Sequence, residues 1–224
     1  MRNDGNGMML DLFEKSSGTE SRQGAPGFGP VLLHGFALRT EDRILAEIDR
    51  VAAAAPFRRM TTPGGYVMSV AMTNCGTVGW VTDRTGYRYD EIDPANGRHW
   101  PPMPPAFLEL ATTAAAAAGF DGFVPDACLV NRYEPGARLS LHQDKDEADF
   151  TAPIVSVSLG LPATFLFGGL KRSDPQIKIP LTHGDVVVWG GPARLVHHGV
   201  MPLKDGVHGA LGRQRINLTF RKAL

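Results

Sequence analysis

Cysteine is nearly absent from the chain, and neither sign of charge predominates. Only Cys75 and Cys128 occur in 224 residues, in apolar or small-residue surroundings ("MTNCG" and "DACLV"). Two cysteines cannot form a disulfide framework for a chain of this length, so we expect two reduced thiols in the core. Lys plus Arg and Asp plus Glu number 23 each. This balance excludes a global basic field, and a nucleic-acid partner would need a local patch of Lys and Arg.

Long apolar runs are also missing. No stretch approaches the roughly 20 apolar residues that span a membrane. The first residues, "MRNDGNGMML", lack the apolar segment of a secretory signal. We therefore expect a cytoplasmic protein without a membrane partner.

The remaining composition is that of an ordinary globular protein. Hydrophobic residues make up 43% and charged residues 21%, and 224 residues suit one domain with a sizeable core. Residues 1–28 are rich in Gly, Ser and charge and predict a mobile tail, in which only Met9–Phe13 is suited to pack. Residues 29–224 are then expected to form the single domain, and we expect a monomer.

Two helices are expected in the first half of the chain. The first covers "TEDRILAEIDRVAAAAP", with Thr40 as N-cap, acidic residues in the first turn and Pro56 at its end. The second covers "PPAFLELATTAAAAAG", opened by Pro104 and Pro105 and closed by Gly119. Both helices would support a β-rich core.

After about residue 125 the pattern changes to short β-rich runs separated by Gly, Pro and Asp. Their spacing of about ten residues favours an antiparallel sandwich or barrel over βαβ units. Between the helices, "GGYVMSVAMTNCG" and "TGYRYDEID" predict further strands and a tight loop. The runs expected to form the core are "ACLVNRY", "PIVSVSLG", "ATFLFGG", "IKIPL", "DVVVWGG", "ARLVHHG" and "QRINLTFR".

The run "RINLTFR" is the most informative of these strands. Side chains alternate between the two faces of a strand, so Ile216, Leu218 and Phe220 would share a core face. An exposed sheet face has a similar pattern. Two arginines on one face nevertheless suit a small diacid, because Arg grips carboxylates bidentately. The face in question carries Arg215, Asn217, Thr219 and Arg221.

A candidate metal site lies in "LSLHQDKDEADF". His142 and Asp144 are two residues apart, so on a strand both point to one side. A His-x-Asp pair with a distant His is the ligand set that holds Fe(II) and leaves positions open for a co-substrate and O₂. The pair alone is a weak motif in a chain with seven histidines. His183 stands in a turn, and the spacing favours His197 or His198 as third ligand without choosing between them.

The order of motifs resembles a known family. "NRYEPG", "LHQDKDE", "HHG" and "RINLTFR" closely resemble the AlkB-type Fe(II)/2-oxoglutarate-dependent dioxygenases, as do "TPGGYVMSVAMTNCG" and "PIVSVSLGLPA" outside the metal motif. The resemblance runs from about Met9 to Arg221. It implies a mainly β fold with flanking helices, made of a double-stranded β-helix (jelly roll) core over 125–224 and an N-terminal nucleotide-recognition lid over about 62–100.

The same resemblance implies the site residues. Fe(II) would be held by His142, Asp144 and His198, the His directly before Gly, whereas His197 stands where bacterial members usually have an aromatic residue. Arg215 would hold the distal carboxylate of 2-oxoglutarate, with Arg221 nearer the metal. The full 2-oxoglutarate set would be Asn131, Tyr133, Arg215, Asn217 and Arg221. The substrate set would be Met72, Trp80, Tyr87, Asp146 and Arg172.

The implied activity is oxidative demethylation of N-alkylated bases such as 1-methyladenine and 3-methylcytosine, in DNA with a preference for single strands, and also in RNA. O₂ would be consumed, 2-oxoglutarate would be decarboxylated to succinate, and formaldehyde would be released, which is a direct reversal of DNA damage. Aromatic residues suit a base extruded from its stack, and Asp146 suits a cationic base. If they line one rim, a phosphate patch would be formed by Arg138, Lys145, Lys171 and Arg172.

Two other functions fit parts of the sequence. The same chemistry on a protein side chain or small metabolite would not need residues 62–89 as a nucleotide lid. A non-catalytic β-sandwich would leave Arg215 and Arg221 without a diacid to grip. Apart from the family resemblance, Trp80 is also a candidate core aromatic, and "TGYRYDEID" is a candidate ordinary hairpin with Tyr87 and Tyr89 on an exposed face.

Overall fold

The computed structural model describes residues 22–23 and 29–224. The tail expected over 1–28 lies outside the described residues except for Arg22–Gln23, which form the short strand β1. The packing expected of Met9–Phe13 also lies outside them. In the described part of the chain, no helix is long and apolar enough to cross a membrane.

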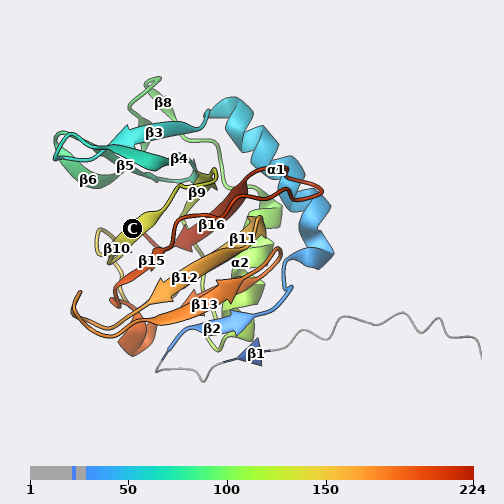
Figure 1. Ribbon diagram of the computed structural model, residues 1–224. Coiled ribbons are helices and arrows are strands. Elements are labelled where there is room, and N and C mark those ends of the chain that lie inside the picture. Colours follow the sequence, from blue (N-terminus) through green and yellow to red (C-terminus); the bar gives the residue numbers. More distant parts are fainter. Residues whose placement is uncertain (1–21, 24–28) are drawn as a thin grey trace, which may run out of the picture.

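Two antiparallel sheets form the core (Figure 1). The larger has the order β1-β2-β14-β11-β16-β9-β4-β3 and the smaller the order β10-β15-β12-β13. The strands of the larger sheet after β1 are β2 (Val31–Leu33), β3 (Arg58–Thr61), β4 (Val67–Gly76), β9 (Ala127–Tyr133), β11 (Ile154–Gly160), β14 (Val186–Trp189) and β16 (Arg215–Arg221). The strands of the smaller sheet are β10 (Leu139–His142), β12 (Ala163–Phe167), β13 (Ile177–Leu181) and β15 (His198–Val200).

The larger sheet is buried on both faces, because its residues alternate between two cores. On β14, Val186 and Val188 belong to the cluster that packs against the helices. Val187 and Trp189 belong to the cluster shared with the smaller sheet. The molecule therefore has three layers, which are helices, large sheet and small sheet, and this agrees with the jelly-roll prediction.

Both predicted helices are confirmed. The helix α1 (Glu41–Ala54) buries Ile44, Ile48 and Val51 at helical spacing. Its predicted N-cap is at the right position, but the Thr40 hydroxyl donates to the Ala37 carbonyl at 3.3 Å instead of capping the helix.

The helix α2 (Pro105–Ala117) begins at a proline, as expected. Four of its buried residues are alanines, which let the helix lie close to the sheet. The helix is followed by Gly119, whose φ of +93° few other residues adopt. In Figure 1, α2 lies behind β11 and β16, and α1 runs along the side of the molecule. Two short 3₁₀ helices, η1 (Leu38–Thr40) and η2 (Gly191–Ala193), complete the helical elements of the described residues.

One predicted strand is shorter than expected. The run "ARLVHHG" was expected to be extended, but η2 continues into a turn at Arg194, whose backbone N–H donates to the Gly191 carbonyl at 3.0 Å. The strand β15 therefore begins only at His198. The remaining core runs form strands where they were predicted.

A hairpin stands over one end of the two sheets (Figure 1). It consists of β5 (Gly79–Asp83) and β6 (Gly86–Asp90), in the register Trp80↔Tyr89. A smaller pair, β7 (Ile92–Asp93) and β8 (Arg98–His99), follows it. In Figure 1 the β5–β6 hairpin lies above β10, the strand that carries His142.

Candidate active site

The β5–β6 hairpin and the strands β9, β10, β15 and β16 line a cavity of about 750 Å³. Every residue predicted to bind metal, diacid or substrate lines this single cavity. The structure thus brings together side chains that are spread over most of the domain.

The predicted metal ligands meet through strand pairing. His142 ends β10 and His198 begins β15, and the two residues are register partners with ring centroids 4.4 Å apart. Asp144 lies just beyond the end of β10, so the expectation that it shares a strand with His142 was wrong. Its Oδ1 is nevertheless 3.6 Å from His142 Nε2, and its Oδ2 is 3.7 Å from His198 Nε2. One donor atom from each residue lies within 4.8 Å of the others, which suits one metal ion.

Both imidazoles present the same nitrogen to this point. The Nδ1 of His142 is 2.9 Å from the Ser140 carbonyl, and the Nδ1 of His198 is 3.0 Å from the Val196 carbonyl. Since a carbonyl only accepts, Nδ1 carries the proton and Nε2 is left with a lone pair. Burial, together with the neighbouring His142, lowers the pKa of His198 to about 3. At neutral pH, His198 is therefore an uncharged imidazole, the form that binds a metal.

The two adjacent histidines, His197 and His198, differ in whether the side chain joins the metal-ligand cluster. His197 points away from the cluster, and its Nδ1 is 3.3 Å from the Gly169 carbonyl. His198 is the one that joins His142 and Asp144. His183 lies in a turn, as expected, and its Nδ1 accepts the Gly160 backbone N–H at 2.8 Å.

Asp144 is held as an anion. Burial raises the pKa of its carboxyl, but Arg221 and the two imidazoles together bring the pKa below the ordinary value. Arg221 donates from Nε at 2.9 Å and from Nη2 at 2.8 Å, both to Oδ2. These two bonds to one oxygen leave Oδ1 for a metal.

Arg215 is a buried cation without a carboxylate partner among the described residues. Its side chain is 1% exposed, Nε donates to Ser158 Oγ at 2.9 Å, and the guanidinium lies over the Tyr133 ring at 5.0 Å. Its Nη1 has no hydrogen-bond partner. Burial lowers the pKa of Arg215, which reflects the cost of a charge away from water. Such a group, exposed only to the cavity, is suited to bind an anion that enters it.

Amides and hydroxyls line the cavity between Arg215 and Arg221. Asn131 Nδ2 donates to Asn217 Oδ1 at 3.2 Å, and Thr219 Oγ1 donates to the same oxygen at 3.0 Å. Asn217 Nδ2 donates to Ser156 Oγ at 2.8 Å and to the Val157 carbonyl at 2.9 Å. The buried Asn131 Oδ1 has no partner. The predicted polar face of β16 is thus confirmed, and it faces the cavity, not solvent.

The predicted substrate residues form the opposite wall. Trp80 and Tyr87 stack with ring centroids 5.7 Å apart and planes 21° apart. Trp80 Nε1 donates to Asp146 Oδ2 at 2.9 Å. Met72 is 1% exposed at the base, and Arg172 is on the exposed loop between β12 and β13. Trp80 therefore lines the cavity, and it also packs against the core cluster shared with the smaller sheet.

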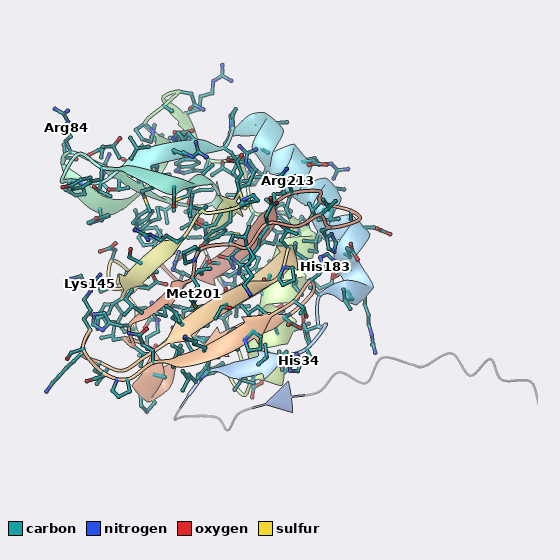
Figure 2. All side chains as sticks on the ribbon, in the orientation of Figure 1. His34, Arg84, Lys145, His183, Met201 and Arg213 are labelled. Carbon is teal, nitrogen blue, oxygen red and sulfur yellow. The ribbon has the colours of Figure 1, made fainter. Side chains whose placement is uncertain are left out.

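Cations gather at the mouth of the cavity. Arg138, Lys145 and Arg172 line it, whereas Lys171 does not. Figure 2 shows Lys145 on the same side of the molecule as Arg84, which lies at the tip of the β5–β6 hairpin. His183 and Arg213 lie on the other side in that view. A local basic rim therefore exists although the net charge of the chain is zero.

Five side chains that support the site were not predicted from the sequence. Ser156 and Ser158 bond the cavity face of β16, and their alternation in "VSVSLG" was a signal that could have found them. Tyr89, Glu147 and Arg194 form a buried group beside Asp144. Tyr89 therefore does not lie on an exposed hairpin face.

Comparison with known proteins agrees with this geometry. Residues 29–221 match the model of a family described as the 2OG-Fe(II) oxygenase superfamily. The chain is 57% identical over 215 residues to alpha-ketoglutarate-dependent dioxygenase AlkB of Escherichia coli (strain K12), which covers 96% of this chain and 98% of the relative. It is 40% identical over 136 residues to DNA N(6)-methyladenine demethylase ALKBH1A of Arabidopsis thaliana, covering 60% of this chain and 38% of the relative.

Solved structures agree as well. The structure of OsALKBH1 is similar, with a TM-score of 0.78 and 28% identity, over 90% of this chain and 100% of that chain. The jelly-roll arrangement of two sheets is thus shared with a solved relative.

Proposed function

Because the chain belongs to the 2OG-Fe(II) oxygenase superfamily, we propose that it removes alkyl groups from the ring nitrogens of nucleic-acid bases by oxidation. The substrates we propose are 1-methyladenine and 3-methylcytosine in DNA, and also in RNA. O₂ and 2-oxoglutarate are consumed, succinate and CO₂ are formed, and the methyl carbon leaves as formaldehyde. The carrying observation is one cavity that holds a metal-ligand cluster, an unpaired buried arginine and an aromatic wall.

The donor set fits Fe(II). Two neutral imidazoles and one carboxylate, from His142, His198 and Asp144, suit that ion and leave coordination positions free. When bound with 2-oxoglutarate, Fe(II) supplies the oxygen activation that hydroxylates the N-alkyl carbon. The hydroxylated carbon then separates from nitrogen as formaldehyde, so the base regains its unmodified form.

The diacid site is proposed on the β16 side of the cavity. Arg215, whose Nη1 is unpaired, would bind the distal carboxylate of 2-oxoglutarate, with the Tyr133 hydroxyl beside it. Asn131 and Asn217 would form hydrogen bonds to the part of 2-oxoglutarate that lies between its two carboxylates. Arg221 would lie at the metal end, where its bonds to Asp144 already keep it.

The base would enter from the hairpin side. We propose residues 62–100 as the recognition lid and 125–224 as the catalytic core. Trp80 and Tyr87 offer ring faces to an extruded base, at about 1–3 kcal/mol per stacked base. The Asp146 carboxylate suits the positive charge of a methylated base, while Met72 and Arg172 complete the wall.

The setting of the reaction follows from the same physics. Extrusion costs less from a single strand, so we propose a preference for single-stranded substrate. Arg138, Lys145 and Arg172 would bind phosphates, so that affinity falls with added salt. We propose a cytoplasmic monomer.

The test is an oligonucleotide that carries 1-methyladenine, incubated with Fe(II), ascorbate and 2-oxoglutarate, beside the same oligonucleotide without the methyl group. Formaldehyde and unmodified adenine are expected only from the methylated strand. Asp144→Ala removes the anionic ligand and should abolish both products. An unchanged oligonucleotide from protein shown to bind iron would overturn the proposed function. A peptide or metabolite that is turned over in its place would support the alternative substrate class.

A further inference from the structure

Glu147 is a buried carboxylate that the proposed reaction does not use. Its side chain is 2% exposed. Oε1 accepts the Tyr89 hydroxyl at 2.6 Å and lies 3.3 Å from Arg221 Nε, and Oε2 lies 3.1 Å from Arg194 Nη2. One carboxylate is thus held by β6, by the turn before β15 and by β16.

The two arginines on Glu147 also hold the metal ligand. Arg221 donates twice to Asp144 Oδ2. Arg194 Nη1 donates to the Asp144 backbone carbonyl at 2.8 Å, and its Nε donates to the Ala152 carbonyl at 3.1 Å. Asp144 is therefore fixed at both its side chain and its backbone by groups that share Glu147.

The charges of this cluster balance, with two carboxylates and two guanidinium groups, all buried. Buried ions are stable only while each keeps its partners, and removing one leaves the others as unpaired buried charges. A displacement of Glu147 must therefore move Arg194 and Arg221, and with them Asp144. The four side chains therefore hold Asp144 as one connected unit.

Tyr89 connects this unit to the hairpin. It lies opposite Trp80 in the β5–β6 register, and Trp80 stacks on Tyr87. The hairpin makes two hydrogen bonds to consecutive residues of the metal segment, from Tyr89 to Glu147 and from Trp80 to Asp146. The Trp80 bond uses only Asp146 Oδ2, so Oδ1 is left to meet a base. The Tyr89–Glu147 bond is part-buried, whereas the Trp80–Asp146 bond is exposed.

We propose that Glu147 is a positioning residue that couples the position of the β5–β6 hairpin over the cavity to the orientation of the metal ligand Asp144. The coupling runs through Tyr89 to the hairpin, and through Arg194 and Arg221 to Asp144. The inference deepens the proposed function and rests on it. When the hairpin lies over the cavity, Trp80 and Tyr87 reach the base while Asp144 is held in position for the metal. Coupling of this kind is reciprocal, so filling the metal site must also steady the hairpin.

The first measurement uses this reciprocity and contains no nucleic acid. Amide hydrogen exchange over Gly79–Asp90 is measured in the full chain, with and without Mn(II) plus 2-oxoglutarate. Ligands should slow exchange in the wild type. In Tyr89→Phe and Glu147→Gln the ratio of the exchange rate without ligands to the rate with ligands should fall about tenfold. The reason is the loss of one hydrogen bond to a charged group.

Glu134→Gln is the matched control. It makes the same chemical change in the exposed Arg59–Glu134 pair, whose 2.8 Å contact also joins β3 to the segment after β9. It should keep the slowing seen in the wild type. Tyr89→Phe removes only a hydroxyl, so it decides the question if Glu147→Gln does not fold. Wild-type slowing in Tyr89→Phe, or no slowing in the wild type, overturns the proposal.

The second measurement is the ratio of formaldehyde to succinate with methylated oligonucleotide. The ratio should be near one for the wild type and Glu134→Gln, and at least about twofold lower for Tyr89→Phe. A purely structural role would lower both products together and leave the ratio unchanged, which counts against the proposal. If the wild type yields no formaldehyde at all, the proposed function fails, while the exchange measurement still decides the coupling.

Discussion

Gly199 lies on β15 directly against the backbone of β10, the two strands that carry the histidine ligands. A Cβ at this position would lie 2.7 Å from the Leu139 carbonyl oxygen and 3.2 Å from Leu141 N and from the Ser140 carbonyl carbon. All three atoms are backbone, so no side chain can rotate away. Gly199→Ala must therefore push β15 from β10, at a cost of about 1–3 kcal/mol for overpacking.

The displacement acts on the metal site directly, because His198 adjoins Gly199 and pairs with His142 across the same two strands. Thermal unfolding should shift down by about 2–4 °C per kcal/mol lost. Titration with Fe(II) should show affinity reduced about 10- to 100-fold, as when groups that orient ligands are disturbed. Gly209→Ala is the control, since no atom lies within 4 Å of its Cβ. Wild-type metal affinity in Gly199→Ala would refute the claim that the β10–β15 contact sets the ligand separation.

Three further outcomes are expected. Arg215→Gln should raise KM for 2-oxoglutarate about 10- to 100-fold, through loss of a charged bond to a carboxylate, whereas the exposed Arg213→Gln should leave it unchanged; equal KM values would remove Arg215 from the diacid site. Trp80→Ala should weaken binding of a methylated oligonucleotide about 5- to 100-fold in a direct titration, and unaltered affinity would contradict stacking there. Burial raises the pKa of Cys128 well above its usual value, and Cys75 is also buried, so a thiol reagent should label neither until the chain unfolds; prompt labelling of the folded chain would disprove core burial.

The core and the polar face of β16 were predictable because they rest on local periodicity. On β16, alternation alone separated Ile216, Leu218 and Phe220 from the cavity face, and the structure keeps that division. Helix bounds followed from Pro105 and Gly119 for similar reasons. Signals of this kind lie within a few residues of one another in the chain.

The metal cluster was only partly predictable. Its members come together through the pairing of β10 with β15, which includes a register shift between Leu139 and His142. No local pattern sets such a shift, so His197 and His198 could be separated only by resemblance to a family or by the structure. The strand also ends at His142, and Asp144 reaches the metal point from a loop held by Arg221.

The buried group formed by Tyr89, Glu147 and Arg194 was not predictable from the sequence. Arg194 was expected in an extended run, and its burial follows from the turn after η2. Lone Glu, Tyr and Arg residues far apart in sequence have no spacing that marks them as partners. Only the fold brings Tyr89 and Arg194 within contact distance of the Glu147 carboxylate.

The proposed oxidation of the N-alkyl carbon is tested by following the methyl carbon itself. An oligonucleotide with a trideuterated methyl group on N1 of adenine is incubated with the protein, Fe(II), 2-oxoglutarate and O₂, and the aldehyde and succinate are quantified by mass spectrometry. Oxidation at that carbon predicts dideuterated formaldehyde in an amount equal to succinate, together with unmodified adenine. Succinate without labelled formaldehyde, with the methyl group still on the base, would contradict it.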